Sequence, residues 1–186
     1  MSLATIRTKV RALLGDNEIT GYDLFTYGAS SIFNISEDNI NSVDSVFEND
    51  IEQGDSYWSY DTTNNRVTTL FSSIAGDTIQ VNYTYFPNYS NSEITNYIQS
   101  ALVHLSINNY YDYIYDATDD TIYPEVEGRE ENLIAMITNI LINKPITSLK
   151  LPDVTINYPE KSSLEDKISK TISVFKHDSS GIFSIL

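Results

Sequence analysis

One junction constrains the fold more than any other stretch of the chain. Across residues 76–86, apolar side chains alternate with polar ones, which predicts a strand with one buried face. From Ile94 to Leu105 the apolar residues recur every three or four positions instead, which predicts an amphipathic helix that begins at a capping box of Ser90 and Glu93. A β-segment therefore meets a long helix within a few residues, and we expect a β-rich module inserted in a helical frame.

The same two periods assign most of the remaining chain to elements. Helical spacing predicts a first helix over residues 3–14, ended by Gly15, a third around residues 133–141, and a last one after a capping box at Ser163. Between residues 31 and 86, apolar segments separated by turn residues predict an antiparallel meander of four or five strands. The predicted fold class is α+β, a bundle frame of about four helices with the meander inserted between the first and second helices.

Domain boundaries follow from these elements. Residues 1–145 are expected to form one domain that includes the β-module at about 31–86. The proline-containing segment 146–160 is expected to be an extended arm, and residues 161–186 a helix followed by an apolar tail. The segment 112–131 is expected to be an acidic loop, because a proline and a glycine interrupt its helical spacing.

The net charge of −15 is concentrated in the middle of the chain. Residues 31–130 carry 17 acidic and two basic side chains, whereas residues 131–186 carry six of each. A surface of that sign repels phosphates, which argues against tight nucleic-acid binding through this region. A solvated face that keeps the protein soluble is the plainer explanation of the same charge.

Other classes of protein are also disfavoured by composition. The chain has no cysteine, so disulfides do not stabilise it and a reducing compartment is expected. Its first residues lack the apolar core of a signal peptide, and no apolar run approaches the roughly 20 residues that a membrane span needs. We expect a soluble protein, made in the cytoplasm, with no membrane partner.

The sequence contains no recognisable catalytic or metal-binding motif. His104 and His177 lie in different predicted helices, and no nucleophile elbow, phosphate-binding loop or dinucleotide fingerprint is present. Four aspartates cluster in the acidic segment, but their spacing fits no cation-binding loop. We therefore expect no catalytic residue, no cofactor and no metal, and a hydrolase with paired carboxylates stays open as an alternative. The clustered aspartates are Asp112, Asp116, Asp119 and Asp120.

Aromatic and apolar side chains are the candidate interaction residues. Tyr57, Trp58 and Tyr60 share one predicted β-segment, and such clusters either stack on sugars or anchor protein interfaces. The chain given closes with four apolar residues behind a Ser-Ser-Gly spacer, and an exposed tail of that kind needs to be covered by the chain's own core or by a neighbouring subunit. The four residues of the tail are Ile182, Phe183, Ile185 and Leu186.

The order of these parts resembles the head–tail connector proteins of tailed phages, also called adaptor or head-completion proteins. The resemblance covers roughly residues 3–145, and its β-insertion is larger than in the all-helical members of the family. Residues 146–186 match no motif of the family. The stretches that carry the resemblance are Leu13-Leu14-Gly15-Asp16, the strand that opens at Gly76-Asp77, the helix start Ser92-Glu93-Ile94, and Glu131-Asn132-Leu133-Ile134-Ala135.

The resemblance implies a structural virion protein without catalytic residues. Members of the family form a ring, commonly twelvefold, that docks beneath the portal vertex, extends the DNA channel and joins the next neck or tail protein. DNA passes through such a ring without specific binding. The resemblance therefore implies the portal protein, further copies of the same chain in a dodecamer, and a neck or tail protein as partners, at the neck of the virion.

The same resemblance assigns places to the candidate residues. Asp112, Asp116, Asp119 and Asp120 are expected to face the channel. Tyr57, Trp58 and Tyr60 are expected to face outward, and the alternative function is a carbohydrate- or receptor-binding tail component that uses them. The contact to the portal or to a neighbouring subunit is expected to involve Ile182, Phe183, Ile185 and Leu186, together with Phe175, Lys167 and Lys170 of the last helix.

Overall fold

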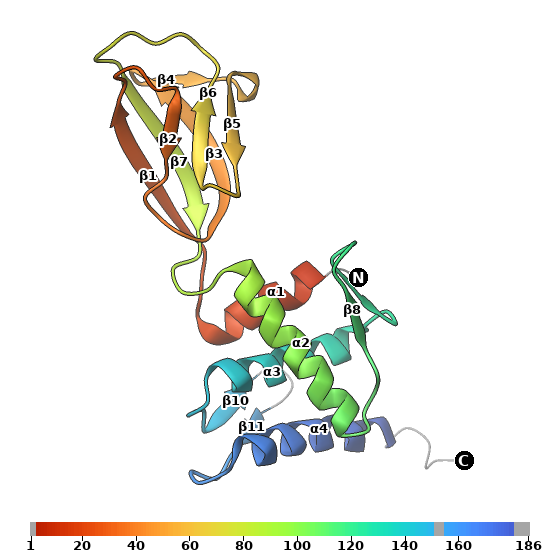
Figure 1. Ribbon diagram of the computed structural model, residues 1–186. Helices are drawn as coiled ribbons and strands as arrows, with labels where there is room; N and C mark the ends of the chain where they lie inside the picture. Colours follow the sequence, from red (N-terminus) through yellow and green to blue (C-terminus); the bar gives the residue numbers. More distant parts are fainter. Residues whose placement is uncertain (1–2, 151–154, 181–186) are drawn as a thin grey trace. The chain divides into compact units, whose positions relative to one another are not determined.

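The computed structural model describes residues 3–150 and 155–180, with side chains as far as Lys176. The chain divides into two compact units, which are treated separately below. Unit 1 consists of residues 1–15 and 91–186, and unit 2 of residues 16–90. The described residues form four α-helices and several antiparallel sheets, which confirms the α+β class (Figure 1).

Unit 2 is built from two antiparallel sheets (Figure 1). The first has the strand order β1-β7-β3-β4 and the second β2-β6-β5. The prediction of one meander of four or five strands was therefore wrong, because seven strands are shared between two sheets and β7 lies between β1 and β3. The elements are β1 (Ile19–Thr26), β2 (Ile32–Asn34), β3 (Ile40–Glu48), β4 (Ile51–Gln53), the 3-10 turn η1 (Asp55–Tyr57), β5 (Trp58–Asp61), β6 (Arg66–Thr69) and β7 (Thr78–Tyr85).

The core of unit 2 lies between its two sheets. The predicted alternation in β7 is confirmed, since Ile79, Val81 and Tyr83 are each at most 2% exposed. They pack with buried residues of the facing sheet, among them Phe33 of β2 and Val67 of β6. Burial of this apolar area is what stabilises the unit.

Strand β1 extends the β unit well before the predicted start near residue 31. Two of its large apolar side chains point away from the core of unit 2, since Tyr22 and Leu24 are 62% and 58% exposed. The inward positions are Gly21, Asp23 and Phe25, which pair with the buried positions of β7. Alternation alone could not reveal a strand whose inward face includes a glycine and an aspartate.

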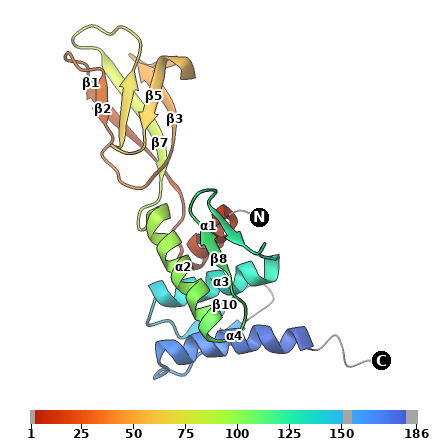
Figure 2. The ribbon, with the colours of Figure 1, turned by 45° about the vertical axis from the view of Figure 1, so that its right-hand side comes forward.

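Unit 1 is organised around a central helix, α3 (Gly128–Ile142), which packs against each of the other three helices. All residues from 133 to 141 are buried, so no side of that stretch is left for solvent. The predicted bundle frame was wrong in arrangement, since α2 runs across α3 and α4 rather than alongside them (Figures 1 and 2). The other helices are α1 (Leu3–Leu14), α2 (Asn91–Ile107) and α4 (Leu164–Ser180).

Two hairpins replace segments that the sequence predicted to be irregular. The expected acidic loop contains the hairpin of β8 (Ile114–Asp116) and β9 (Thr121–Tyr123), and α3 already begins at Gly128. The expected extended arm contains β10 (Ser148–Lys150) paired with β11 (Thr155–Asn157). These strands are three residues long, which is too short for a periodic pattern to stand out.

The second hairpin also belongs to the packed part of unit 1. Leu149, Ile156 and Tyr158 are at most 5% exposed. The Tyr158 hydroxyl lies 2.7 Å from Thr171 Oγ1 of α4, and both groups are buried. The segment is therefore a core element of unit 1 and not the arm that its prolines indicated.

Two predicted helix ends, the start of α4 and the end of α1, are confirmed by the structure. The Asp166 N–H donates to Ser163 Oγ at 3.1 Å, and the Ser163 N–H donates to Asp166 Oδ2 at 3.2 Å, which is the capping box expected before α4. Gly15 ends α1 with a left-handed φ of +69°, a conformation that glycine adopts at little cost.

Gly21 provides a test of the packing in unit 2. A Cβ atom at this position would lie 2.7 Å from Tyr83 Cε2, and that ring is buried in the core. We expect Gly21→Ala to lower the free energy of unfolding of the β unit by about 1–3 kcal/mol, the usual cost of overpacking. Urea denaturation followed by circular dichroism measures the change.

Gly28→Ala is the matched control, because a Cβ atom there has no neighbour within 4 Å. Its effect should stay within about 0.5–1 kcal/mol. Equal destabilisation by the two substitutions would contradict the packing described for Gly21.

Candidate interaction site

The candidate interface residue Phe175 of α4 packs within unit 1. Phe175 is 3% exposed, and the Arg129 guanidinium lies 5.6 Å from its ring centroid. Arg129 also donates to the Phe175 carbonyl at 2.7 Å. Phe175 is therefore a core residue rather than an exposed contact. The four apolar residues Ile182, Phe183, Ile185 and Leu186 lie outside the described residues.

The two lysine candidates hold α4 against its neighbours. Lys167 is 6% exposed, and its Nζ donates to the Lys144 carbonyl at 2.8 Å, just beyond the end of α3. Lys170 Nζ donates to the Asn157 carbonyl of β11 at 2.7 Å. Both ammonium groups thus satisfy backbone carbonyls of unit 1, which differs from their expected role at a subunit contact.

One acidic candidate fixes the β8–β9 hairpin to the helices. Asp120 Oδ2 accepts a hydrogen bond from the Arg7 guanidinium of α1 at 2.6 Å, and Asp120 Oδ1 accepts one from the Tyr115 hydroxyl at 3.1 Å. Arg7 also donates to Thr95 Oγ1 of α2 at 3.2 Å. The charge of Asp120 is therefore paired inside unit 1, unlike that of a residue placed only to repel DNA.

Two further acidic candidates shape the turn of the same hairpin. Asp116 Oδ1 accepts the Thr118 N–H at 2.8 Å, and Asp119 Oδ2 accepts the Tyr123 hydroxyl at 2.7 Å. Hydrogen bonds from Thr121 and Tyr123 lower the pKa of Asp119, so this carboxyl stays ionised. Both side chains stay exposed while they stabilise the turn.

The aromatic candidates of unit 2 do not form one outward surface. Tyr57 is 54% exposed, but Trp58 and Tyr60 pack partly buried against the core of the sandwich. The Tyr60 hydroxyl donates to Asn65 Oδ1 at 2.9 Å, and burial, with the charge of Asp61, raises the pKa of Tyr60. Trp58 and Tyr60 are thus structural, contrary to the expectation that they face outward.

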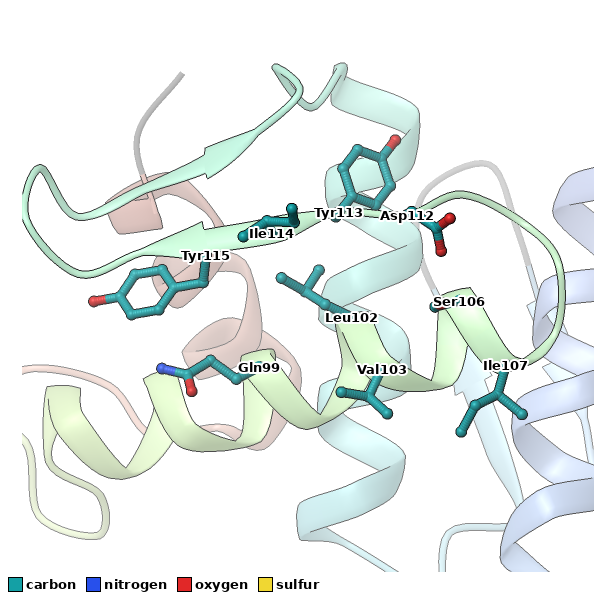
Figure 3. A pocket seen from close by; sticks show the side chains of 9 residues that line it. All are labelled: Gln99, Leu102, Val103, Ser106, Ile107, Asp112, Tyr113, Ile114 and Tyr115. Atoms are coloured by element: carbon teal, nitrogen blue, oxygen red, sulfur yellow. The ribbon is translucent and has the colours of Figure 1, made fainter.

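An exposed apolar surface of unit 1 lies at the end of α2, beside Asp112 and beside a cluster of tyrosines whose sequence position favours a core or subunit interface. A hollow of about 430 Å³ separates α2 from β8, and Figure 3 shows Ile114 of β8 opposite Leu102 of α2. We call it the α2–β8 groove. It is lined by Gln99, Leu102, Val103, Ser106 and Ile107 of α2 and by Asp112, Tyr113, Ile114 and Tyr115.

Three large apolar side chains of the α2–β8 groove are more than half exposed to solvent. Val103, Ile107 and Ile114 are 57%, 69% and 70% exposed, whereas Leu102 beneath them is 3% exposed. Val103 and Ile107 lie one helical turn apart, outside the stripe that α2 buries against α3. Their spacing of four residues is a sequence signal for a second apolar face, and only the folded position of Ile114 shows that it lines the same hollow.

The groove continues toward α4 through a tyrosine-lined end. Adjoining hollows of about 490 and 470 Å³ share Tyr110 and Tyr111, and the second of them reaches Lys176. The rings of Tyr111 and Tyr113 lie 4.9 Å apart. We call Tyr110, Tyr111 and Tyr113 the tyrosine end of the groove. Aromatic rings with exposed hydroxyls are typical of surfaces that bind other polypeptides.

No protein-family model matches the chain, and no curated protein matches it. Within residues 3–150 and 155–176, no group of three or more histidine or acidic side chains is arranged to hold a metal ion. In the part of the chain that the structure describes, no helix has the length and apolar content that crossing a bilayer requires.

The arrangement of the groove suits binding of apolar side chains rather than chemistry on a substrate. Its floor and rim are aliphatic, and its polar atoms are mostly tyrosine hydroxyls and carboxylates. Burial, and next the charge of Glu130, raises the pKa of Tyr113 to about 12. The Tyr113 hydroxyl therefore stays neutral at physiological pH and does not act as a base.

The raised pKa of Tyr113 predicts a pH dependence of stability. Its pKa is 10.0 without the folded environment and about 12 within it. Between these values the folded protein binds a proton that the unfolded chain has lost, so the stabilisation present below about pH 10 is lost as the pH rises toward about 12. We expect Tyr113→Phe to make the urea midpoint less sensitive to pH in that window.

Tyr97→Phe is the control, because it removes the hydroxyl of an exposed tyrosine of α2 that is not among the groups raising the pKa of Tyr113. In this variant the urea midpoint should depend on pH as it does in the wild-type protein. If the urea midpoint of Tyr113→Phe changes with pH as much as that of the wild-type protein, Tyr113 is not the group responsible for the pH dependence.

Proposed function

We propose that this chain is a structural virion protein, a head-to-tail adaptor that forms a ring, docks on the portal vertex, extends the DNA channel and joins the next neck or tail protein. The observation that carries the proposal is the α2–β8 groove, an exposed apolar surface on a rigid helical unit. Contiguous apolar surface of this kind is typical of proteins that function by assembly. The proposed protein is not an enzyme and uses no cofactor.

The order of elements supports the family chosen for this proposal. A short basic helix precedes a β unit, and three further helices follow it. This is the order on which the resemblance to connector proteins rests, with a larger β unit than in the all-helical members. Because unit 2 has its own core, it is suited to contact a separate partner, which we propose to be the next neck or tail protein.

The charge distribution supports passage of DNA without specific binding. A ring of copies that each carry a net charge of −15 repels phosphates, and phosphate contacts supply most nonspecific affinity. Asp112, Asp116 and Asp119 remain the acidic candidates with exposed side chains. Of these three, we propose that Asp119 in the turn of the hairpin, rather than the paired Asp120, faces the channel.

Co-expression with the portal protein encoded nearby tests the proposal. We expect the two proteins to co-purify, and negative-stain imaging to show stacked coaxial rings. Deletion of residues 181–186 is expected to abolish docking while circular dichroism stays unchanged. A monodisperse adaptor that ignores its portal under conditions where the portal ring itself assembles would contradict the function.

A carbohydrate- or receptor-binding tail component is the second candidate, and one observation in unit 2 favours it. On the outer face of the first sheet, Gln80 Nε2 donates to Asn82 Oδ1 at 2.7 Å, and Asn82 Nδ2 donates to Ser45 Oγ at 3.1 Å. Tyr22 pairs with Asn82 on the neighbouring strand and is 62% exposed. A neutral amide and hydroxyl surface beside an exposed ring suits a sugar.

A glycan array distinguishes this candidate from the first. If it is correct, Tyr22→Ala should remove the binding, because the substitution deletes the exposed ring without touching the core. Tyr57→Ala, which removes another half-exposed ring of unit 2, is the control and should bind normally. An array without hits for the wild-type protein would count against a sugar-binding role.

A further inference from the structure

Each copy of unit 1 carries an apolar surface that no described part of the chain covers. Val103, Ile107 and Ile114 line the α2–β8 groove and are more than half exposed, and Leu102 forms a buried floor beneath them. Exposing such a surface permanently is unfavourable, and it favours association with another apolar segment.

The chain itself supplies a segment with matching chemistry. Residues 182–186 read Ile-Phe-Ser-Ile-Leu, two apolar pairs around one serine. An extended segment of this length reaches roughly 15–18 Å, enough to span the two helical turns from Leu102 to the tyrosine end of the groove. Phe183 suits the tyrosine end, where rings already pack on one another, and the aliphatic residues suit the contact with Val103 and Ile107.

The direction of α4 favours a groove on another copy. The helix continues to Ser180, about 6 Å beyond Lys176. In both ribbon views α4 runs on past the end of α2 (Figures 1 and 2). Lys176 lines the hollow at the tyrosine end of its own copy, and its Nζ donates to the Asn108 carbonyl at 2.8 Å, but the helix continues from there to Ser180. Because the predicted Ser-Ser spacer is helical, a return to Leu102 of the same copy requires the chain to reverse its direction directly at Gly181.

Charge complementarity points to the same partner. The stretch 112–127, which borders the groove, contains six acidic and no basic residues, whereas residues 161–176 contain four lysines and two acidic residues. Lys161, Lys170 and Lys176 are exposed on one side of the contact, and Asp112 and Asp116 on the other. Lys170 and Lys176 each donate one hydrogen bond to a backbone carbonyl of their own copy, and their charges remain exposed. A contact between α4 of one copy and the hairpin of the next therefore brings opposite charges together.

We propose that residues 181–186 of one copy bind in the α2–β8 groove of a second copy. Each copy then donates one segment and accepts one, which is a heterologous contact that closes into a ring when the rotation between copies allows it. The contact supplies the subunit interface of the adaptor and to that extent rests on the proposed function. Self-association without any portal tests it separately.

Cysteine cross-linking between mixed chains is the direct experiment, because the protein has no cysteine of its own. One full-length chain carries Ile107→Cys, and a second chain with a different tag carries Phe183→Cys. After mixing and mild oxidation, we expect a disulfide-linked heterodimer at a yield at least about tenfold above the control. The control replaces Ile107→Cys by Ile51→Cys, an equally exposed isoleucine of unit 2.

Sedimentation velocity of the full-length protein provides the second measurement. Ile107→Asp and deletion of residues 181–186 should each weaken self-association at least about tenfold, whereas Ile51→Asp should not. Ile107 is 69% exposed and Ile51 is 67% exposed, so neither change is expected to unfold its unit. Circular dichroism confirms that each variant is folded.

Three results would overturn the proposal. A chain carrying both Ile107→Cys and Phe183→Cys that forms its disulfide within one molecule shows that the segment covers its own groove. Cross-linking no stronger than the Ile51→Cys control shows that the groove does not receive the segment. If Phe183→Cys instead links to the portal while the adaptor stays monomeric, the adaptor function stands and this interface is wrong.

A strong cross-link between copies of a protein that does not bind the portal supports the interface proposed here and contradicts the adaptor function.

Discussion

The burial of residues 133–141 of α3 is the constraint on which unit 1 depends. These residues are buried on every side, and each of the other three helices packs against α3. Even the carboxylate of Glu131, 3% exposed at the start of α3, is held by Lys9 Nζ of α1 at 2.6 Å. A buried carboxylate without that partner would be strongly destabilising. Because α2 commits its Ile94–Leu105 stripe to α3, Val103 and Ile107 remain outside, and the groove is a consequence of how α3 is covered.

Unit 2 is suited to insertion in a helical unit because its two ends meet. The first residue of β1, Ile19, pairs with the last residue of β7, Tyr85. Just outside this pair, Asp16 is 1% exposed and its Oδ1 accepts hydrogen bonds from the backbone N–H and the side-chain amide of Asn88, each at 3.2 Å. The β unit thus closes on itself with its own core, and its entry and exit need no extra chain.

Sequence periodicity identified the elements that bury a regular face and missed those held by distant contacts. The helices and β7 were predictable because each repeats an apolar period over several turns or residues. The β8–β9 hairpin depends on Asp120 meeting Arg7, and the β10–β11 hairpin on Tyr158 meeting Thr171, pairs that no local window contains. The candidate site was missed for the same reason. Phe175 and Lys167 of the last helix were expected at an interface together with the apolar tail, yet packing within unit 1 uses both.

Charge and exposed apolar surface act in opposite directions on association, and the balance between them limits how copies can meet. A net charge of −15 repels other copies in most orientations, although salt screens that repulsion beyond about 8 Å under physiological conditions. An approach that places the exposed lysines of α4 near the acidic hairpin replaces part of that repulsion by attraction. In the interface proposed above, the same approach brings the apolar segment to the groove. Within that proposal the acidic surface favours one orientation among those that the apolar groove alone would permit.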